Sequence, residues 1–133
     1  MKVYLDSVII IYYLVHVGDF QVRAARRLAA LHAAEDEIVI SDLVRMECRV
    51  DPIRKSDNIR LARFDGFFVR SDVQVVPITT AVFDRATQVR ATHGYKAIDS
   101  INLAAAVEAG CGLFLTNDAL LSGFPDITVE ILR

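Results

Sequence analysis

Four acidic residues are the strongest candidates for chemistry in this sequence. Asp6 and Asp118 each follow a short apolar run that is typical of a buried strand. Glu47 and Asp99 each lie in a segment with helical spacing. A single acidic residue at such a place often only caps a helix or closes a turn. The recurrence of all four beside the ends of successive elements favours a shared site.

The chemistry open to these residues follows from their type. Carboxylates gathered at one place repel one another, which raises their pKa values unless a cation shares the site. No histidine or cysteine recurs with them at metal-ligand spacing, and an all-oxygen ligand set suits Mg²⁺ or Mn²⁺ rather than zinc. Such an ion can activate a water for in-line attack on a phosphodiester. The residue types therefore indicate metal-dependent phosphoryl chemistry.

The elements that would position these carboxylates alternate along the chain. Short apolar runs predict five strands, over residues 2–5, 37–40, 73–78, 113–116 and 127–132. Helical spacing predicts helices over residues 8–14, 20–34, 55–70, 80–93 and 98–109, and a further helix after residue 42. Ser41 and Asp42 supply an amino-terminal cap for this further helix, from which Glu47 projects.

This alternation predicts the fold class. Near-continuous apolar strands separated by helices are typical of a mainly parallel sheet covered on both faces, a three-layer α/β/α sandwich with about five strands. Ligands of such sheets bind beyond the carboxyl ends of the strands. Asp6 and Asp118 follow the carboxyl ends of the first and fourth strands, and Glu47 and Asp99 lie on helices beside the same edge. The fold prediction therefore gathers the four carboxylates at one rim.

Length and composition indicate one domain over residues 1–133, because no Pro/Gly/Ser-rich stretch divides the chain. Hydrophobic residues make up 53% of it, so we expect apolar surface beyond the core for a partner. The net charge of -2 gives no general electrostatic case for nucleic-acid binding. No apolar run is long enough to cross a bilayer, and we expect a cytoplasmic protein with Cys48 and Cys111 reduced.

Four motifs, in an order and spacing that cover almost the whole chain, resemble those of PIN-domain proteins. They are Asp6-Ser7, Ser41 with Glu47, the run from Ile98-Asp99 to Ala106, and Leu115-Thr116-Asn117-Asp118. Each motif is weak alone, whereas four in the right order are fairly specific. Within the family, the VapC-type toxins are the most similar group. One departure is Val8, where many relatives carry Asn or Ser, so one polar contact near the metal is absent.

The resemblance implies a Mg²⁺- or Mn²⁺-dependent endoribonuclease that cleaves RNA, commonly transfer or ribosomal RNA, to a 3′-hydroxyl and a 5′-phosphate. It places Asp6, Glu47, Asp99 and Asp118 in the family's acidic site, as catalytic residues and metal ligands. Thr116 matches a hydroxyl residue that orients the carboxylates or contacts phosphate. A cognate VapB-like antitoxin that covers the site, and a homodimer formed through helical faces, are also implied.

Several polar residues near the predicted rim are candidates for supporting roles or for RNA contacts. Arg45, Arg49 and Lys96 flank the acidic residues in sequence and are candidates for holding RNA phosphates. Ser7 is a supporting candidate beside the first carboxylate. Tyr95 lies in a turn and either covers the core or stacks on a base. The helices over residues 8–14 and 20–34 are the candidates for a groove that takes an antitoxin helix.

Two alternatives remain open on the sequence. A phosphoryl-accepting domain of the receiver or dehalogenase kind also has an Asp after its first strand. A dehalogenase site has a second Asp two residues later, where this chain has Val8, and no receiver-like acidic pair precedes Asp6. The other alternative is a catalytically silent PIN-like scaffold that binds RNA or protein. Retention of all four carboxylates argues against it, because an unused acidic cluster is electrostatically unfavourable.

Overall fold

The short apolar segments form one parallel sheet in a computed structural model that describes residues 1–133. The strands are β1 (Lys2–Leu5), β2 (Glu37–Ser41), β3 (Val73–Val76), β4 (Leu113–Thr116) and β5 (Thr128–Ile131). They lie in the order β3-β2-β1-β4-β5, and every neighbouring pair is parallel. The central strands are almost entirely buried, as their near-continuous apolar sequences require.

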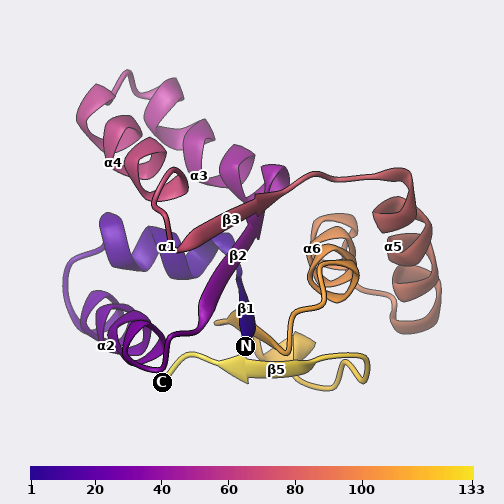
Figure 1. Ribbon diagram of the computed structural model, residues 1–133. Coiled ribbons are helices and arrows are strands. Elements are labelled where there is room, and N and C mark those ends of the chain that lie inside the picture. Colours follow the sequence, from indigo (N-terminus) through magenta and orange to yellow (C-terminus); the bar gives the residue numbers. More distant parts are fainter.

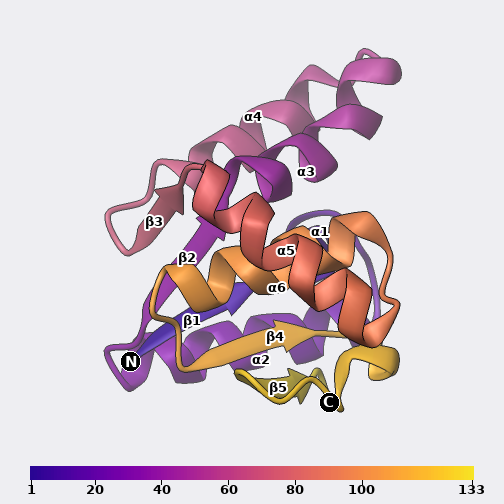
Figure 2. The ribbon, with the colours of Figure 1, turned by 90° about the vertical axis from the view of Figure 1, so that its right-hand side faces the viewer.

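Helices cover both faces of this sheet (Figure 1). They are α1 (Ser7–Leu14), α2 (Asp19–Ala33), α3 (Asp42–Arg54), α4 (Asn58–Phe68), α5 (Thr80–His93) and α6 (Ala97–Glu108), with a 3₁₀ turn, η1, at Ala119–Leu121. α1 to α4 lie on one side of the sheet, and α5 and α6 lie on the other, where Figure 2 shows them in front of the strands. The predicted three-layer α/β/α fold is therefore confirmed, and its sheet is parallel throughout.

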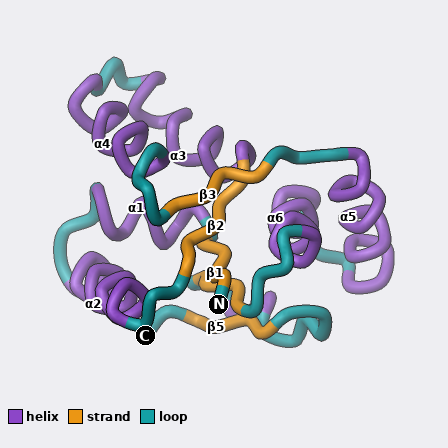
Figure 3. The backbone as a smooth tube through the Cα atoms, in the orientation of Figure 1, coloured by secondary structure: helices purple, strands orange, loops and turns teal.

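The order of the strands creates a switch point between β1 and β4. From β1 the chain moves outward through β2 to β3, then crosses to α5 by the loop visible in Figure 3, and adds β4 on the opposite side of β1. Connections that leave in opposite directions from neighbouring strands open a crevice at the carboxyl edge of the sheet. The predicted rim lies at this crevice.

Two local expectations were wrong. The predicted helix over residues 55–70 begins only at Asn58, because Ser56 has a positive φ of 53° and Asp57 accepts a hydrogen bond from the Arg60 N–H at 3.1 Å, which caps α4. Ser41 occupies the cap position of α3, but its side chain makes no capping hydrogen bond. The Ser41 hydroxyl is engaged by Tyr4 instead, at 2.8 Å.

One hydrophobic core runs through both faces of the sheet. Tyr4 of β1 and Phe114 of β4 are register partners whose rings stack at 5.3 Å with an interplanar angle of 8°. Three consecutive buried alanines, Ala104 to Ala106, allow α6 to pack closely on the strands. No single helix has the length and hydropathy to cross a membrane, although α1 and α2, bent by 109° at their junction, together pass that test on composition.

Candidate active site

Asp6 lies at the switch point, between the end of β1 and the start of α1. Its backbone N–H donates to the Leu115 carbonyl at 3.0 Å, which joins the end of β1 to β4. Its carboxylate makes no capping hydrogen bond to α1. Instead, Oδ2 accepts a hydrogen bond from the Thr116 hydroxyl at 2.7 Å, and Oδ1 lies 3.5 Å from the Ser7 hydroxyl. Helix capping therefore does not explain this residue.

Thr116 links Asp6 to Asp118. The Thr116 hydroxyl donates to Asp6 and accepts from the Asp118 N–H at 3.1 Å. Asp118 Oδ1 accepts from the Leu120 N–H at 3.0 Å and so caps η1. The ordinary turn role of Asp118 is therefore real, but it uses one carboxylate oxygen and leaves the other without a protein hydrogen bond.

Glu47 projects from α3 toward α6. Its Oε1 accepts a hydrogen bond from Asn102 Nδ2 at 3.2 Å. Its neighbours Val44 and Cys48 are buried, whereas Met46 is 51% exposed. Glu47 itself is half-buried, so part of its carboxylate remains open to the rim.

Three of the four carboxylates, Asp6, Glu47 and Asp99, have raised pKa values, in part because of charges within the set. Burial raises the pKa of Asp6, and the charge of Asp118 raises it further, while hydrogen bonds from Thr116 and Ser7 oppose the shift. Burial also raises the pKa of Glu47, as do the charges of Asp6 and Asp99. The pKa of Asp99 is raised by burial and by the charges of Asp6 and Asp118. Each of these three groups is therefore held in an environment that disfavours its charge.

One basic side chain acts on this cluster. Lys96, at the cap position of α6, lowers the pKa of Asp99 but does not reverse its upward shift. No three His, Cys, Asp or Glu side chains form a ready-made metal cage. Mg²⁺ retains several waters and needs only one or two direct carboxylates, so a looser set of oxygen donors with surplus negative charge fits a hydrated divalent cation.

The predicted supporting residues divide between two places. Ser7, Thr116 and Lys96 lie with the carboxylates. Arg45 instead pairs with Asp42 at 3.0 Å on α3, and its guanidinium lies 5.8 Å from the centre of the Phe68 ring.

The other two candidates for RNA contacts, Arg49 and Tyr95, also contact residues within the fold. Arg49 Nε lies 3.0 Å from Asp65, across the α3–α4 pair. Tyr95 stacks on His93 at 5.2 Å and meets the edge of the Phe124 ring, so it covers the core. Neither Arg45 nor Arg49 makes an ion pair with the four carboxylates.

Sequence reasoning missed a buried polar group beneath the site. Asn102 is only 2% exposed, and Tyr4 and Ser41 are fully buried beside it. Tyr4 OH lies 2.7 Å from Asn102 Oδ1 and 2.8 Å from Ser41 Oγ. Burial raises the pKa of Tyr4, so its phenol keeps its proton. The available signal was an asparagine within the apolar run of α6, because a buried amide requires partners.

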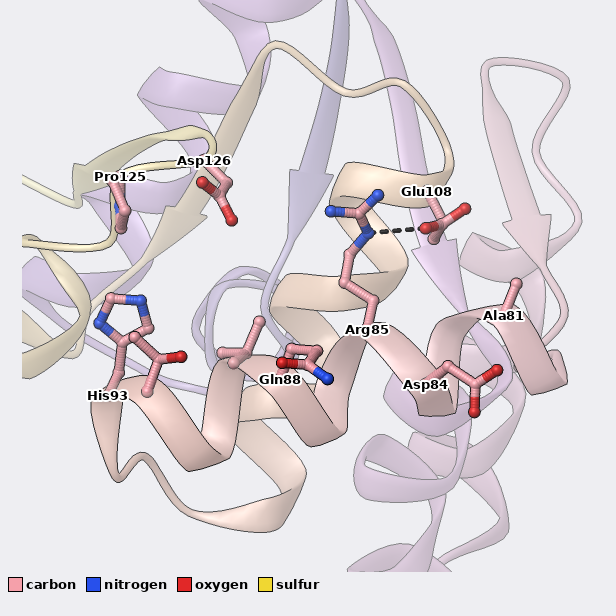
Figure 4. A pocket seen from close by; sticks show the side chains of 10 residues that line it. Ala81, Asp84, Arg85, Gln88, His93, Glu108, Pro125 and Asp126 are labelled. Carbon is pink, nitrogen blue, oxygen red and sulfur yellow. Dashed lines mark hydrogen bonds and ion pairs between the residues drawn. The ribbon is translucent and has the colours of Figure 1, made fainter.

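The largest cavity of the molecule is a different place. It has a volume of about 670 Å³ and lies between α5, the end of α6 and the turn before β5 (Figure 4). Arg85 crosses it to pair with Glu108 at 2.6 Å, and Asp84, His93 and Asp126 also line it. None of the four candidate carboxylates contributes to its wall. Its size therefore gives no reason to move the candidate site from the rim.

Comparisons with known proteins agree with this fold and identify a family. A family model for the PIN domain matches residues 3–126. VapBC2 from Rickettsia felis, solved with a promoter DNA fragment, is similar with a TM-score of 0.82 and 17% identity, over 100% of both chains. DNA-bound VapBC from Salmonella typhimurium has a TM-score of 0.79 and 20% identity, over 98% of both chains.

A third similar structure is VapC20 from Mycobacterium tuberculosis, described as a toxin that cleaves the sarcin-ricin loop. Its TM-score is 0.74 at 16% identity, over 95% of this chain and 98% of that one. At these identities the structural likeness supports the fold alone. No curated protein is significantly similar to this chain in sequence. The family match nevertheless spans all four candidate carboxylates.

Proposed function

Because this chain belongs to the PIN-domain family, we propose that it is a Mg²⁺- or Mn²⁺-dependent endoribonuclease and the toxin of a toxin–antitoxin pair. One observation carries the proposal. The pKa values of Asp6, Glu47 and Asp99 are all raised, chiefly by burial and in part by one another or by Asp118. A divalent cation would relieve this repulsion, and perturbed carboxylates in a crevice are typical of functional sites.

In the proposed mechanism, Asp6, Glu47, Asp99 and Asp118 hold the cation directly or through water. When bound, the cation supplies positive charge that activates a water and stabilises the leaving oxygen. Glu47 Oε1 accepts a hydrogen bond from Asn102, and its carboxylate accepts a proton from the attacking water. In-line attack on the RNA phosphodiester would break the P–O3′ bond, leaving a 5′-phosphate and a 3′-oxygen that takes a proton from solvent to become the 3′-hydroxyl. The raised pKa of Glu47 suits this role as a base.

Thr116 and Lys96 support that chemistry in different ways. The Thr116 hydroxyl fixes Asp6 Oδ2 in one orientation and spans to the Asp118 backbone. Lys96 is exposed beside Asp99, where its ammonium can bind an RNA phosphate next to the scissile bond. Ser7 and Arg45 complete the proposed set of RNA-contacting or supporting residues, although Arg45 must leave Asp42 to reach a phosphate.

The proposal includes a cognate VapB-like antitoxin that covers the rim, and a homodimer, in a cytoplasmic protein. Complexes named VapBC are among the similar structures. Large exposed apolar side chains support a protein partner. They lie just before α2, at its start and along α3, at Val17, Phe20, Val22, Met46, Val50 and Ile53.

Cleavage of total cellular RNA tests the enzymatic proposal. Purified protein free of antitoxin is incubated with Mg²⁺, with Mn²⁺ or with EDTA, beside Asp99→Asn and the exposed control Asp84→Asn. We expect discrete products from the wild type and the control with metal, none with EDTA, and a loss of at least ~100-fold in rate for Asp99→Asn. Folded wild-type protein that cleaves nothing with either metal would contradict the proposal and favour the silent scaffold.

A further inference from the structure

A continuous line of hydrogen bonds, buried except at its part-buried last link, ends on Glu47. It begins at Ser41, the last residue of β2, and passes through Tyr4 of β1 and Asn102 of α6 to Glu47 of α3. Successive donor–acceptor distances are 2.8, 2.7 and 3.2 Å. Three distant parts of the sequence, β1, the consecutive elements β2 and α3, and α6, therefore meet in one polar path beneath the candidate site.

The chemistry of these groups fixes the direction of the path. The Glu47 carboxylate can only accept when ionised, so it must receive the Asn102 amide N–H, and the amide oxygen then faces Tyr4. The phenol has a single proton, which it donates to that oxygen, and the Ser41 hydroxyl donates to the phenol oxygen. If the Asn102 amide were flipped, its oxygen would face the Glu47 carboxylate, and these two acceptors would repel each other. Every donor in the path therefore points toward Glu47.

Such a path is more than the core needs. Three polar side chains between 0 and 2% exposed occupy positions that apolar residues could fill, and a partly satisfied buried network is unfavourable. Aligned donors polarise one another, which strengthens the last hydrogen bond to the carboxylate. We propose that Asn102 is a positioning residue, held in one orientation by Tyr4, that fixes Glu47 toward the other three carboxylates and so sets the affinity of the site for a divalent cation.

This inference rests on the proposed function, and binding of Mn²⁺ without RNA tests it. Mn²⁺ affinity is measured by titration calorimetry, with a thermal unfolding curve for each variant. Asn102→Leu removes the amide at similar size. Tyr4→Phe keeps the stack on Phe114 and removes only the hydroxyl. Ser100→Ala is the matched control, since Ser100 is a buried polar residue of the same helix that bonds only to backbone carbonyls.

We expect Asn102→Leu to weaken Mn²⁺ binding about 10-fold, because it removes a partner that orients a metal ligand. We expect Tyr4→Phe to weaken binding about threefold and Ser100→Ala to weaken it less than twofold. The decisive comparison is made in Glu47→Gln protein. If Asn102 acts through Glu47, adding Asn102→Leu to Glu47→Gln causes no further loss of affinity.

Three results would overturn the inference. Asn102→Leu and Tyr4→Phe proteins that fold and bind Mn²⁺ like the wild type would show that the path is only structural. An equal further loss in the Glu47→Gln background would show that Asn102 acts independently of Glu47. A wild-type protein that neither binds Mn²⁺ nor cleaves RNA would overturn the proposed function and the inference with it. If the wild type binds Mn²⁺, the role of Asn102 is tested by metal affinity and the proposed function is tested separately by RNA cleavage.

Discussion

Neutral hydrogen-bond donors, rather than cations, hold the candidate carboxylates in place. Asp6 receives the Thr116 hydroxyl at 2.7 Å, and Glu47 receives the Asn102 amide at 3.2 Å. Neither makes an ion pair within the protein. A neutral donor orients a carboxylate without neutralising it, so negative charge remains available for a bound cation. This division suits a site whose positive charge comes from outside the chain.

Thr116 is the residue where this reasoning is most easily tested. Thr116→Val keeps the shape of the side chain but removes the donor to Asp6 and the acceptor for the Asp118 N–H. We expect RNA cleavage to fall about 10-fold and unfolding free energy to fall by about 1–2 kcal/mol. Thr116→Ser, which retains the hydroxyl, serves as the control. Wild-type cleavage rates in Thr116→Val would refute an orienting role.

The sequence separation between a site residue and its partners explains which site residues could be predicted. Each carboxylate follows a local signal, such as the end of an apolar run before Asp6 or the start of a helix at Asp99. Asn102 is marked only as an asparagine within an apolar run, and this signal does not identify its partners, because Glu47 and Tyr4 are 55 and 98 residues away. Arg45 was misleading for the opposite reason: it lies near Glu47 in sequence, but its i,i+3 partner Asp42 engages it.

At the scale of elements, the strands were predictable and the helix ends less so. A buried parallel strand is a short apolar run between breakers, and all five predicted strands lie within two residues of the observed ones. Helix ends depend on single capping residues, and α4 starts three residues later than predicted because Asp57 caps it. The order of the strands, which creates the switch point, depends on long-range pairing that no local pattern encodes.

Replacing either of two glycines, Gly94 at the end of α5 or Gly66 within α4, by alanine is expected to change the stability of the fold in opposite directions. Gly94 ends α5 with φ +70°, just before the turn into α6, and an alanine there adopts a strained left-handed conformation. Gly66 lies within α4, where an added Cβ meets nothing within 4 Å. We expect Gly94→Ala to lower the unfolding free energy by about 1 kcal/mol and Gly66→Ala to raise it by about 0.5–1 kcal/mol. Urea unfolding of both variants measures this, and equal signs would contradict it.

Across the whole molecule, the raised carboxyl pKa values link stability to pH and to metal. A group whose folded pKa lies above its unfolded value of about 4 stabilises the fold while protonated. That stabilisation is fully present below about pH 4 and is lost as pH rises through the raised pKa values of Asp6, Glu47 and Asp99. Asp72 acts in the opposite sense, because its ion pair with Arg70 lowers its pKa, so its contribution is lost as pH falls.

Asp6→Asn separates these contributions, since it removes one raised carboxyl and the charge that raises the pKa values of Glu47 and Asp99. In EDTA, we expect this variant to gain stability relative to the wild type as pH rises from about 4 to 7. Saturating Mg²⁺, at about 100 times its dissociation constant, stabilises the wild type by about 2.7 kcal/mol and the variant far less.

Urea unfolding across this pH range, with and without Mg²⁺, measures both effects, and exposed Asp126→Asn is the control. If the stability difference between Asp6→Asn and the wild type did not change with pH, the raised carboxyl pKa values at the rim would be contradicted. Equal stabilisation of both proteins by Mg²⁺ would place its binding away from Asp6. The joint dependence on pH and metal is therefore a test of the rim as one electrostatic unit, made on the folded molecule without any RNA.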